Sequence, residues 1–471
     1  MAETRLRRYL DRYAEPIVTE FETQLRPHIH QTYQFVLVIP LYAEPRACLE
    51  QVLPSDLQNT VVIGVVNAAS DRPSPSVHRT QILLSHLRGG QAPLTWVPYT
   101  ADTALLVVDC CSPGRQLPPK QGVGLARKIG ADLAIACIET QLVASPWIYC
   151  TDADATLPEG YFDGEALASD VAVALYPFSH QPAHAAILHY EISLRYYVTQ
   201  LAIAGSPYAF QTIGSLLKIS ASHYAAVRGF PKRRAAEDFY LLNKLAKTGK
   251  VVQLQAPQIV LSSRKSTRVP FGTGATMVRL AADPRLQFYD PRIFKCLRAW
   301  LALIDPLWQA REEITQSGLA GWWQRRVQEE ELVLAILLQL GLEQTLTQAY
   351  RQCQDDRHFQ FFLAVWFDAF RTLKFVHGLR DGLPLASGHR AFPSHPLAQL
   401  AKTMDWSQDL GQGSSTDLSL PTLQSINHGL MTQELQLPAE VGPTVVLADP
   451  IADPKRHCQD HSAPNTAANP Y

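Results

Sequence analysis

Four short apolar runs in the first third of the chain form the clearest pattern in the sequence. Each run is continuously hydrophobic, which is typical of strands buried on both faces of a parallel sheet. Helically spaced segments or turn-rich loops separate them, and this alternation predicts βαβ units. The sequence therefore predicts an α/β fold with a mostly parallel sheet and helices on both faces. The runs are 35–40, 60–67 and 104–109, and a fourth within 147–154 that ends in two aspartates.

Hydrophobic spacing and composition divide the chain into four regions. Apolar residues at helical spacing from 4 to 25 predict one N-terminal helix within residues 1–30, packed on an α/β domain of residues 31–285. Residues 286–383 carry Trp, Leu and Phe at helical spacing, which predicts a C-terminal helical appendage. Residues 384–471 are rich in Pro, Ser, Gln and Thr. We expect them to be a disordered tail, because they have too little apolar surface to fold alone.

Composition narrows the class of protein. The chain has 471 residues, 46% hydrophobic and 18% charged, with a net charge of −1, so no overall field favours nucleic acid or an anionic membrane. Its eight cysteines form no Cys-x-x-Cys pair, which argues against a zinc site and fits a reducing compartment. The longest apolar run, 332–338, is too short to cross a bilayer. We expect a cytoplasmic protein without a transmembrane segment, and peripheral membrane contact stays open.

The fourth apolar run ends in Asp152-Ala153-Asp154, the first acidic motif. Side chains two residues apart on an extended chain lie on the same side, and two carboxylates placed there repel each other unless a cation is near. Hard cations such as Mg²⁺ or Mn²⁺ prefer oxygen ligands of this kind. Open α/β sheets also bind ligands at the carboxyl ends of their strands. Asp154 and Asp152 are therefore candidate metal ligands, and a polar turn after a strand is the alternative.

The second acidic motif, Glu237-Asp238, begins a predicted helix that ends near Gly249. Acidic residues at this position stabilise a helix by capping it and by interacting with its dipole, so a structural role is one interpretation. A carboxylate within hydrogen-bond reach of a hydroxyl can also act as a general base. The two interpretations are compatible, because capping bonds would also orient a base.

Basic residues cluster on both sides of this helix, with Arg228 before it and Arg264 and Arg268 after it. Most surface charge runs are only solvated faces. These arginines, however, flank the acidic motifs, and the last two lie among Ser, Thr and Gly, a composition that suits binding of phosphate or carboxylate oxygens. They are candidates for binding a phosphate or an anionic acceptor.

From about Phe35 to Val252 the sequence resembles a family 2 glycosyltransferase with the GT-A fold. Four segments carry the resemblance in the right order and spacing. Alanine at position 43 stands where asparagine is common, and the turn 67–71 is less acidic than the family's. The matching segments are Ile39-Pro40-Leu41-Tyr42-Ala43-Glu44, then Gly124, Ala126, Arg127, Lys128 and Gly130, then Asp152-Ala153-Asp154, and finally Gly229-Phe230-Pro231 with Glu237-Asp238-Phe239-Tyr240-Leu241-Leu242.

The resemblance implies a hexosyltransferase that moves a sugar from a nucleotide-diphosphate donor to a hydroxyl of a small or anionic acceptor. It implies direct displacement with inversion, with Asp238 as general base oriented by Glu237. It also implies a divalent cation on Asp154, while Asp152 bonds the ribose or a metal-bound water. The donor-binding residues that it implies are Pro40, Tyr42, Glu44, Asn67, Arg127, Lys128 and Asp152.

Two other functions stay open. The run Asp152-Ala153-Asp154-Ala155-Thr156 also fits the nucleophile motif of a haloacid-dehalogenase-type phosphotransferase, in which Asp152 would attack a phosphoryl group. The βαβ array before the motif, and the lack of a later Gly-Asp-x-x-x-Asp segment, count against this function. A non-catalytic nucleotide-sugar-binding protein would keep the fold without needing both Asp154 and Asp238.

Overall fold

The computed structural model describes residues 4–72, 74–164, 166–266, 268, 272–282, 288–327, 331–382, 420–437 and 440–443. These residues form two compact units. The first is built from Met1–Arg298 together with the described part of Pro384–Gly442, and the second from Ala299–Leu383.

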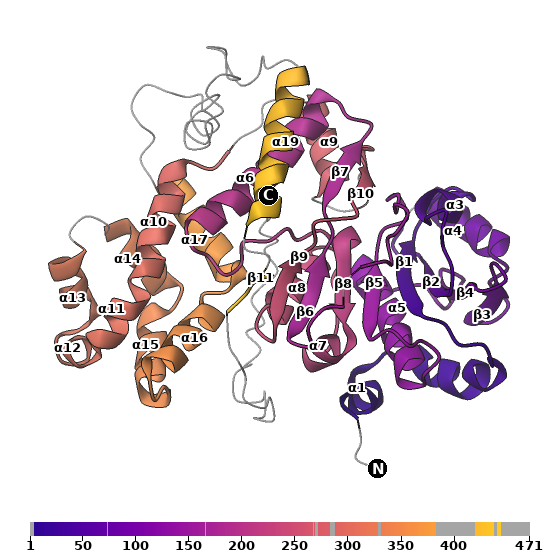
Figure 1. The fold of residues 1–471 in the computed structure, drawn as a ribbon, viewed down its shortest axis with the longest axis horizontal. Helices are drawn as coiled ribbons and strands as arrows, with labels where there is room; N and C mark the ends of the chain where they lie inside the picture. Colours follow the sequence, from indigo (N-terminus) through magenta and orange to yellow (C-terminus); the bar gives the residue numbers. More distant parts are fainter. Residues whose placement is uncertain are drawn as a thin grey trace. The chain divides into compact units, whose positions relative to one another are not determined.

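A nine-stranded sheet forms the centre of the first unit (Figure 1). Its strands are β1 (Phe35–Leu41), β2 (Thr60–Asn67), β3 (Leu94–Pro98), β4 (Ala104–Cys110), β5 (Trp147–Cys150), β6 (Val171–Leu175), β8 (Leu217–Ser220), β9 (Lys250–Gln253) and β11 (Glu440–Val441). Their order is β11-β9-β6-β8-β5-β1-β2-β4-β3. β1 pairs in parallel with both β2 and β5, whereas β3, β8 and β11 run antiparallel to their neighbours.

The four predicted apolar runs are confirmed as β1, β2, β4 and β5. Every residue of β2 and β4 is buried, as expected for strands covered on both faces. Pro40 is tolerated inside β1 because its nitrogen, which cannot donate a hydrogen bond, faces a side where no strand pairs with it. Val38 accepts a bond from the Thr151 amide on the β5 side, and Pro40, two residues on, turns its nitrogen to that side after pairing with β5 has ended.

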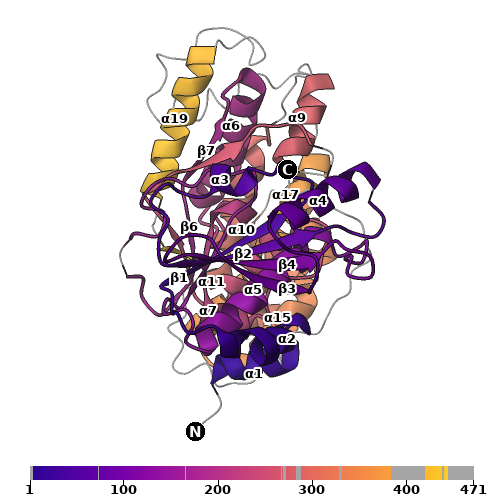
Figure 2. The ribbon, with the colours of Figure 1, turned by 90° about the vertical axis from the view of Figure 1, so that its right-hand side faces the viewer.

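Helices cover both faces of the sheet, so the predicted α/β class is confirmed. α1 (Arg5–Tyr13) and α5 (Gly122–Glu139) lie on one side, while α3 (Cys48–Val52) and α4 (Ser74–His86) lie on the other (Figure 2). α5 packs against β1 and β2. The approach is close because residue 130 is glycine: a Cβ there would lie 2.4 Å from Val38 Cγ1.

The prediction of a single N-terminal helix from 4 to 25 is wrong, because the structure has a break within this range. α1 ends at Tyr13, and α2 (Ile17–Glu20) begins after Pro16. Ala14 has an extended backbone, which ends the first helix before the proline, where an interior N–H would be lost. The helix continues beyond α2 as a π turn, Phe21–Leu25.

The expected disordered tail also requires a correction. α19 (Leu420–Gln436) is a helix that packs along α6 (Ala185–Ile203), and β11 extends the sheet beyond β9. Leu423, Ile426 and Leu430 are buried on one face of α19. Composition hid this helix because polar residues surround that narrow apolar face. Residues 384–419 and 444–471, to which the prediction also applies, lie outside the described residues.

The second unit is helical, which confirms the predicted C-terminal helices. Trp300, Trp322 and Phe359 are among its buried side chains. No single described helix is both long and apolar enough to cross a membrane, although α14 and α15, bent by 71° at their junction, pass that test of length and composition as a pair. The helices are α11 (Ile304–Gln309), α12 (Arg311–Ser317), α13 (Leu319–Arg326), α14 (Glu331–Gln339), α15 (Leu342–Gln352), α16 (Asp356–Trp366) and α17 (Ala369–Gly382), preceded by α10 (Pro291–Ala302).

Candidate active site

The predicted acidic residues come together at the carboxyl ends of the central strands. Three arginines form ion pairs with four of them, and the charge of Arg127 acts on the fifth, Asp238. We call the five acidic side chains the carboxylate cluster: Glu44 after β1, Asp152 and Asp154 after β5, and Glu237 and Asp238 at the start of α8 (Glu237–Leu245). The arginines are Arg127, Arg264 and Arg268.

Arg127 joins the two acidic motifs. Its side chain comes from α5 and is only 3% exposed. Nη2 donates to Asp152 Oδ1 at 2.5 Å, and Nε donates to Glu237 Oε1 at 2.9 Å. Gly214 makes room for the guanidinium, because a Cβ there would lie 2.5 Å from Nη2. The second oxygen of Asp152 accepts a bond from the Ser215 hydroxyl. The first two donors of Arg127 thus fix the two motifs relative to each other.

The third guanidinium nitrogen of Arg127, Nη1, is buried and has no hydrogen-bond partner among the described residues. A buried donor attached to a charged group is costly to leave unpaired. This atom therefore marks a place beside Asp152 and Glu237 where a further oxygen acceptor would be stabilised.

Asp154 has a different partner from Asp152. Arg264 Nε lies 2.8 Å from Asp154 Oδ2. The same guanidinium makes a bidentate pair with Glu44, at 2.7 and 2.8 Å. Fork-like pairs of this kind fix geometry as well as adding energy. Arg264 therefore connects the residue after β1 with the second aspartate after β5.

Arg268 and Tyr42 complete this side of the site. Arg268 donates to Glu44 and, at 3.2 Å, to the carbonyl of Ala43. The guanidinium groups of Arg72 and Arg268 both lie over the Tyr42 ring, 5.4 and 5.6 Å from its centroid. Cations over an aromatic face are attracted by its quadrupole. Tyr42 therefore holds a position beside the arginines rather than packing into the core.

The pKa values separate Glu44 from the rest of the cluster. Burial raises the pKa of Glu44, but bonds and charges from Arg264 and Arg268 outweigh it and leave this pKa below its usual value. Burial, with the Asp152 charge, raises the pKa of Asp154 to about 6 despite Arg264. Burial is also the main cause that raises the pKa of Glu237 and of Asp238, against the charge of Arg127. Carboxylates with raised pKa values in a cleft are typical of functional sites.

The backbone before α8 is strained. Ala236, the N-cap residue, has φ of 62° in the left-handed region and makes no side-chain capping bond. This conformation costs a non-glycine residue roughly 1–2 kcal/mol. Asp238 Oδ1 accepts from the backbone N–H of Phe239 at 2.8 Å. Asp238 therefore lies in the first turn and is oriented by a local bond, although it is not the N-cap residue.

The structure does not bring three of the predicted site residues to the cluster. Lys128 follows Arg127 by one position, which turns its side chain about 100° around α5 and away from the cluster. Its Nζ donates to Tyr9 Oη at 2.8 Å and lies 3.0 Å from Asp132 Oδ2, so Lys128 holds α1 to α5. The other two are Asn67, which donates to the carbonyls of Leu41 and Val65, and Arg228, which is exposed over the Tyr13 ring.

Two residues that were not predicted from the sequence contact the cluster or its arginines. Ser215 bonds Asp152, and Arg72 donates to the backbone of Arg268 at 3.0 Å. Gly214-Ser215 lies inside an otherwise apolar stretch that leads into β8, where a glycine is the one local signal of close backbone approach. Arg72 follows β2 in a turn and carries no such signal.

A divalent cation fits the charges of this site. Burial raises the pKa values of Asp154, Glu237 and Asp238 despite the nearby guanidinium groups, so a bound cation would stabilise their ionised forms. Within the described parts of the chain, no group of three or more His, Cys, Asp or Glu side chains could hold a metal ion. The chain would therefore supply few ligands of its own, Asp154 foremost, and oxygens of a bound substrate would have to complete the shell.

Comparisons with known proteins find low similarity to solved structures. No protein-family model and no curated protein matches the sequence. The chain is similar to S. aureus TarS, residues 1–349 in complex with UDP-GlcNAc, at 10% identity and a TM-score of 0.33, covering 74% of this chain and 89% of that one. It is also similar to the mannosyltransferase PcManGT from Pyrobaculum calidifontis, in complex with GDP-Man and Mn²⁺, at 12% identity and a TM-score of 0.32, covering 92% and 94%. These values are too low for either likeness to decide a function.

Proposed function

We propose that this protein is a glycosyltransferase of the GT-A, family 2 type that transfers a hexose from a nucleotide-diphosphate donor to an acceptor hydroxyl. The observation that carries the proposal is the pair of hydrogen bonds that Arg127 donates to the two acidic motifs. It holds Asp152, beside the candidate cation ligand, and Glu237, beside the candidate base, in one arrangement in which Arg127 and Glu237 are buried and Asp152 is partly exposed. A transferase of this kind needs a leaving-group site and a base at a fixed separation, because positioning the reactants supplies much of the rate.

In this proposal Asp238 accepts the proton of the acceptor hydroxyl. Its raised pKa makes it a stronger base at neutral pH than an ordinary aspartate. Glu237, fixed by Arg127, and the Phe239 amide orient it. Direct displacement by the activated hydroxyl inverts the anomeric centre.

The donor would occupy the side of the cluster that carries the arginines. Asp154 would hold a divalent cation, which when bound stabilises the diphosphate leaving group. Arg264 and Arg268 lie beside Asp154 and Glu44, where their guanidinium groups suit the oxygens of a diphosphate or of a small anionic acceptor. Tyr42 lies under Arg268 at the same edge and is the candidate for contact with the nucleoside.

The two alternative functions make less use of these contacts. A phosphotransferase would need Asp152 as a free nucleophile, yet Arg127 engages one of its oxygens and Ser215 the other. A non-catalytic binding protein would have no use for a strained Ala236 and a raised pKa at Asp238.

The test is a panel of nucleotide sugars incubated with the full chain and Mn²⁺, with acceptor present and absent. We expect nucleoside diphosphate release that depends on the cation and is lost in excess chelator. Release of inorganic phosphate from a phosphorylated substrate would favour the phosphotransferase instead. Tight donor binding without release, with any acceptor tried, would favour the binding protein.

A further inference from the structure

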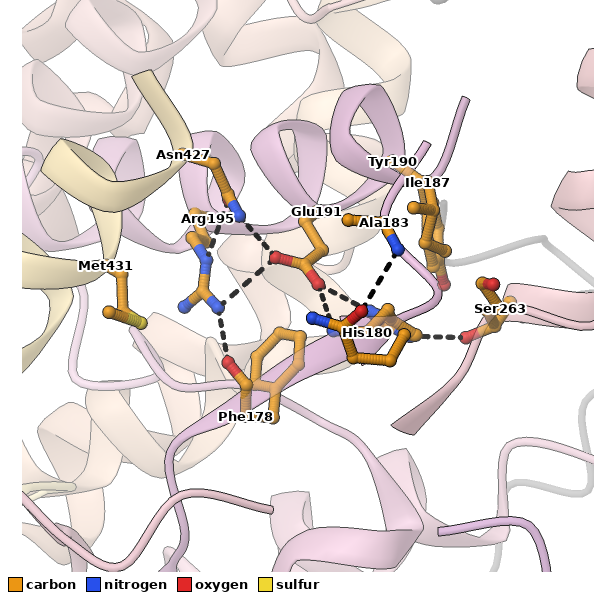
Figure 3. Close-up of polar contacts among 12 residues, drawn as sticks. Phe178, His180, Ala183, Ile187, Tyr190, Glu191, Arg195, Ser263, Asn427 and Met431 are labelled. Carbon is orange, nitrogen blue, oxygen red and sulfur yellow. Dashed lines mark hydrogen bonds and ion pairs between the residues drawn. The ribbon is translucent and has the colours of Figure 1, made fainter. Parts of the chain in front are cut away.

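A second buried network of charged side chains lies outside the carboxylate cluster (Figure 3). Glu191 and Arg195, both on α6, are each only 1% exposed. Arg195 donates to Glu434, to Asn427 Oδ1 at 3.2 Å and to the carbonyl of Phe178 at 2.7 Å. Asn427 in turn donates to Glu191 Oε2 at 2.5 Å. Since Asn427 and Glu434 belong to α19, the network ties this C-terminal helix to α6.

His180 connects the network to a separate two-stranded sheet. It lies in β7 (Phe178–Gln181), which pairs in parallel with β10 (Ile259–Ser262). Its backbone N–H and its Nδ1 lie 2.5 and 2.9 Å from Glu191 Oε1. An ionised carboxylate only accepts hydrogen bonds, so Nδ1 carries a proton here. Nε2 then faces the hydroxyl of Thr273 at 3.2 Å.

Two of the three arginines of the candidate active site, Arg264 and Arg268, lie on a segment whose two ends are attached at this same strand. The arginine segment comprises the described residues 263–266, 268 and 272–273. At its start, Ser263 donates from its amide to Gln181 and from its hydroxyl to Pro182, each at 3.0 Å. At its end, Thr273 meets His180. The start and the end also approach each other, since Ser266 donates to the carbonyl of Gly274 at 3.2 Å.

We propose that α19 positions Arg264 and Arg268 of the candidate active site. The contacts form a continuous relay of hydrogen bonds from the helix to the end of the arginine segment, and each member has a defined partner on either side. In this relay Asn427 and Glu191 are positioning residues, because they contact neither the carboxylate cluster nor a substrate. In order, the members are Asn427, Glu191, His180 and Thr273.

The relay matters for chemistry because of what the arginine segment holds. Arg264 pairs with Asp154 and Glu44, and Arg268 pairs with Glu44. When the end of the segment is released, these pairs lose their fixed geometry and diphosphate oxygens meet less ordered donors. This catalytic meaning rests on the proposed function, whereas the mechanical link from α19 to the segment does not.

The mechanical link is tested by hydrogen exchange on the full chain without ligand. Asn427→Leu and Thr273→Val break the relay at opposite ends while keeping side-chain size. We expect each to speed amide exchange in residues 263–273 roughly fivefold, the ratio that corresponds to the loss of one hydrogen bond. The matched control is His428→Leu, at the exposed neighbouring position of α19, which should leave that exchange unchanged. Thr273→Ser keeps the hydroxyl and should restore protection.

Two results would overturn the link. One is faster exchange in α19 of Asn427→Leu with unchanged exchange in residues 263–273. The other is unchanged exchange of that segment in Thr273→Val, which tests the relay even where the first variant loses the helix.

A second measurement separates the relay from the proposed function. Calorimetry with UDP or GDP and Mn²⁺ should give roughly fivefold weaker binding for both relay variants under conditions in which the domain is folded. Equal affinity in wild type and variants, together with faster exchange, would overturn the positioning role. If wild type binds neither diphosphate while exchange responds as expected, the relay stands and the proposed function fails.

Discussion

Arg127 and Arg195 are both buried arginines that link carboxylates from distant parts of the chain, but their surroundings differ in how completely they are paired. All three guanidinium nitrogens of Arg195 have partners. Arg127 leaves Nη1 without one among the described residues. The carboxylates paired with the two arginines also differ in pKa. The pKa of Glu191 is lowered, because its hydrogen bonds to His180 and the charge of Arg195 outweigh burial. The pKa of Glu237 is raised, because burial outweighs the charge of Arg127.

The difference indicates what each cluster is for. Burying ions is costly, and only full pairing in good geometry offsets the cost. Arg195 itself is fully paired within the protein and holds α19 in place, although Glu434 Oε1 has no hydrogen-bond partner among the described residues. In the carboxylate cluster Arg127 Nη1 lacks a partner among the described residues and three carboxylates have raised pKa values, so a bound substrate and a cation would stabilise these groups. The same ion-pair chemistry therefore serves the fold in one place and a ligand in the other.

The sharpest test of the ligand-binding side is Asp238→Asn. Asparagine keeps the shape and the bond from the Phe239 amide but accepts no proton. We expect turnover to fall about 10²–10⁴-fold with donor affinity retained. Steady-state turnover and calorimetric donor affinity, measured on folded protein, check this. Near wild-type turnover would move the base elsewhere, with Glu237 the next candidate.

The control for that variant is Asp154→Ala. It removes the candidate cation ligand and should weaken donor binding and turnover together, because donor diphosphate and cation bind as a unit. If Asp154→Ala kept full donor affinity in Mn²⁺, Asp154 would be excluded as the cation ligand.

The role of Arg195 in holding the fold together predicts that Arg195→Met lowers the free energy of unfolding. Methionine keeps much of the volume but leaves Glu191 and Glu434 without their arginine partner. Removing one partner of a buried pair costs about 3–5 kcal/mol in the free energy of unfolding. Arg7→Met, which breaks the more exposed pair with Glu22, should cost less than about 1 kcal/mol. Denaturant unfolding compares the two, and equal effects would contradict the distinction.

A smaller effect is expected from pH. A cation binds only the deprotonated carboxylate, so protons compete with it below the pKa of Asp154, which is raised to about 6. Mn²⁺ affinity should be constant above this pH and should fall about tenfold per unit as the pH drops below it. Titrations with Mn²⁺ between pH 5 and 8 measure this dependence. Affinity that stays constant down to about pH 4 would show that Asp154 is not the ligand.

The smallest expected effect belongs to Arg264→Gln. Arg264 neutralises Asp154 without a cation, so its removal should raise Mn²⁺ affinity about two- to fivefold, in line with a partly exposed ion pair. Arg228→Gln removes the same charge from an exposed site over Tyr13 and serves as the control. An equal gain in both variants would mean that net charge alone, and not the Arg264 pair, sets the affinity.

The central strands could be predicted because their burial on both faces leaves continuous apolar runs. Strands β6 and β8 were not predicted, although β6 is as apolar as β1. Their partners come from distant parts of the chain, and local pattern does not reveal non-local pairing. α19 was missed for a related reason: its apolar face is defined by α6, some 220 to 240 residues earlier in the sequence, as the separations within the Asn427 and Glu434 bonds show.

The acidic residues of the site could be proposed from motifs, because carboxylates after a strand or before a helix stand out locally. Their partners could not. Arg127 and Lys128 are adjacent and equally basic in the sequence, yet only one faces the cluster, since a helix turns about 100° per residue. Arg264 could be suspected from composition, but its pairing with both Glu44 and Asp154 depends on the fold.

The short pairing of β11 with β9 has a consequence for the behaviour of the protein in solution. Without β11, β9 would be the last strand of the sheet, with its outer N–H and C=O groups unpaired. Such an edge is a template on which another chain can add a strand, and natural proteins usually blunt or cover it. Glu440 and Val441 cover it with backbone from the same chain. A shortened chain that lacked them would keep its central strands but expose a surface prone to self-association and aggregation.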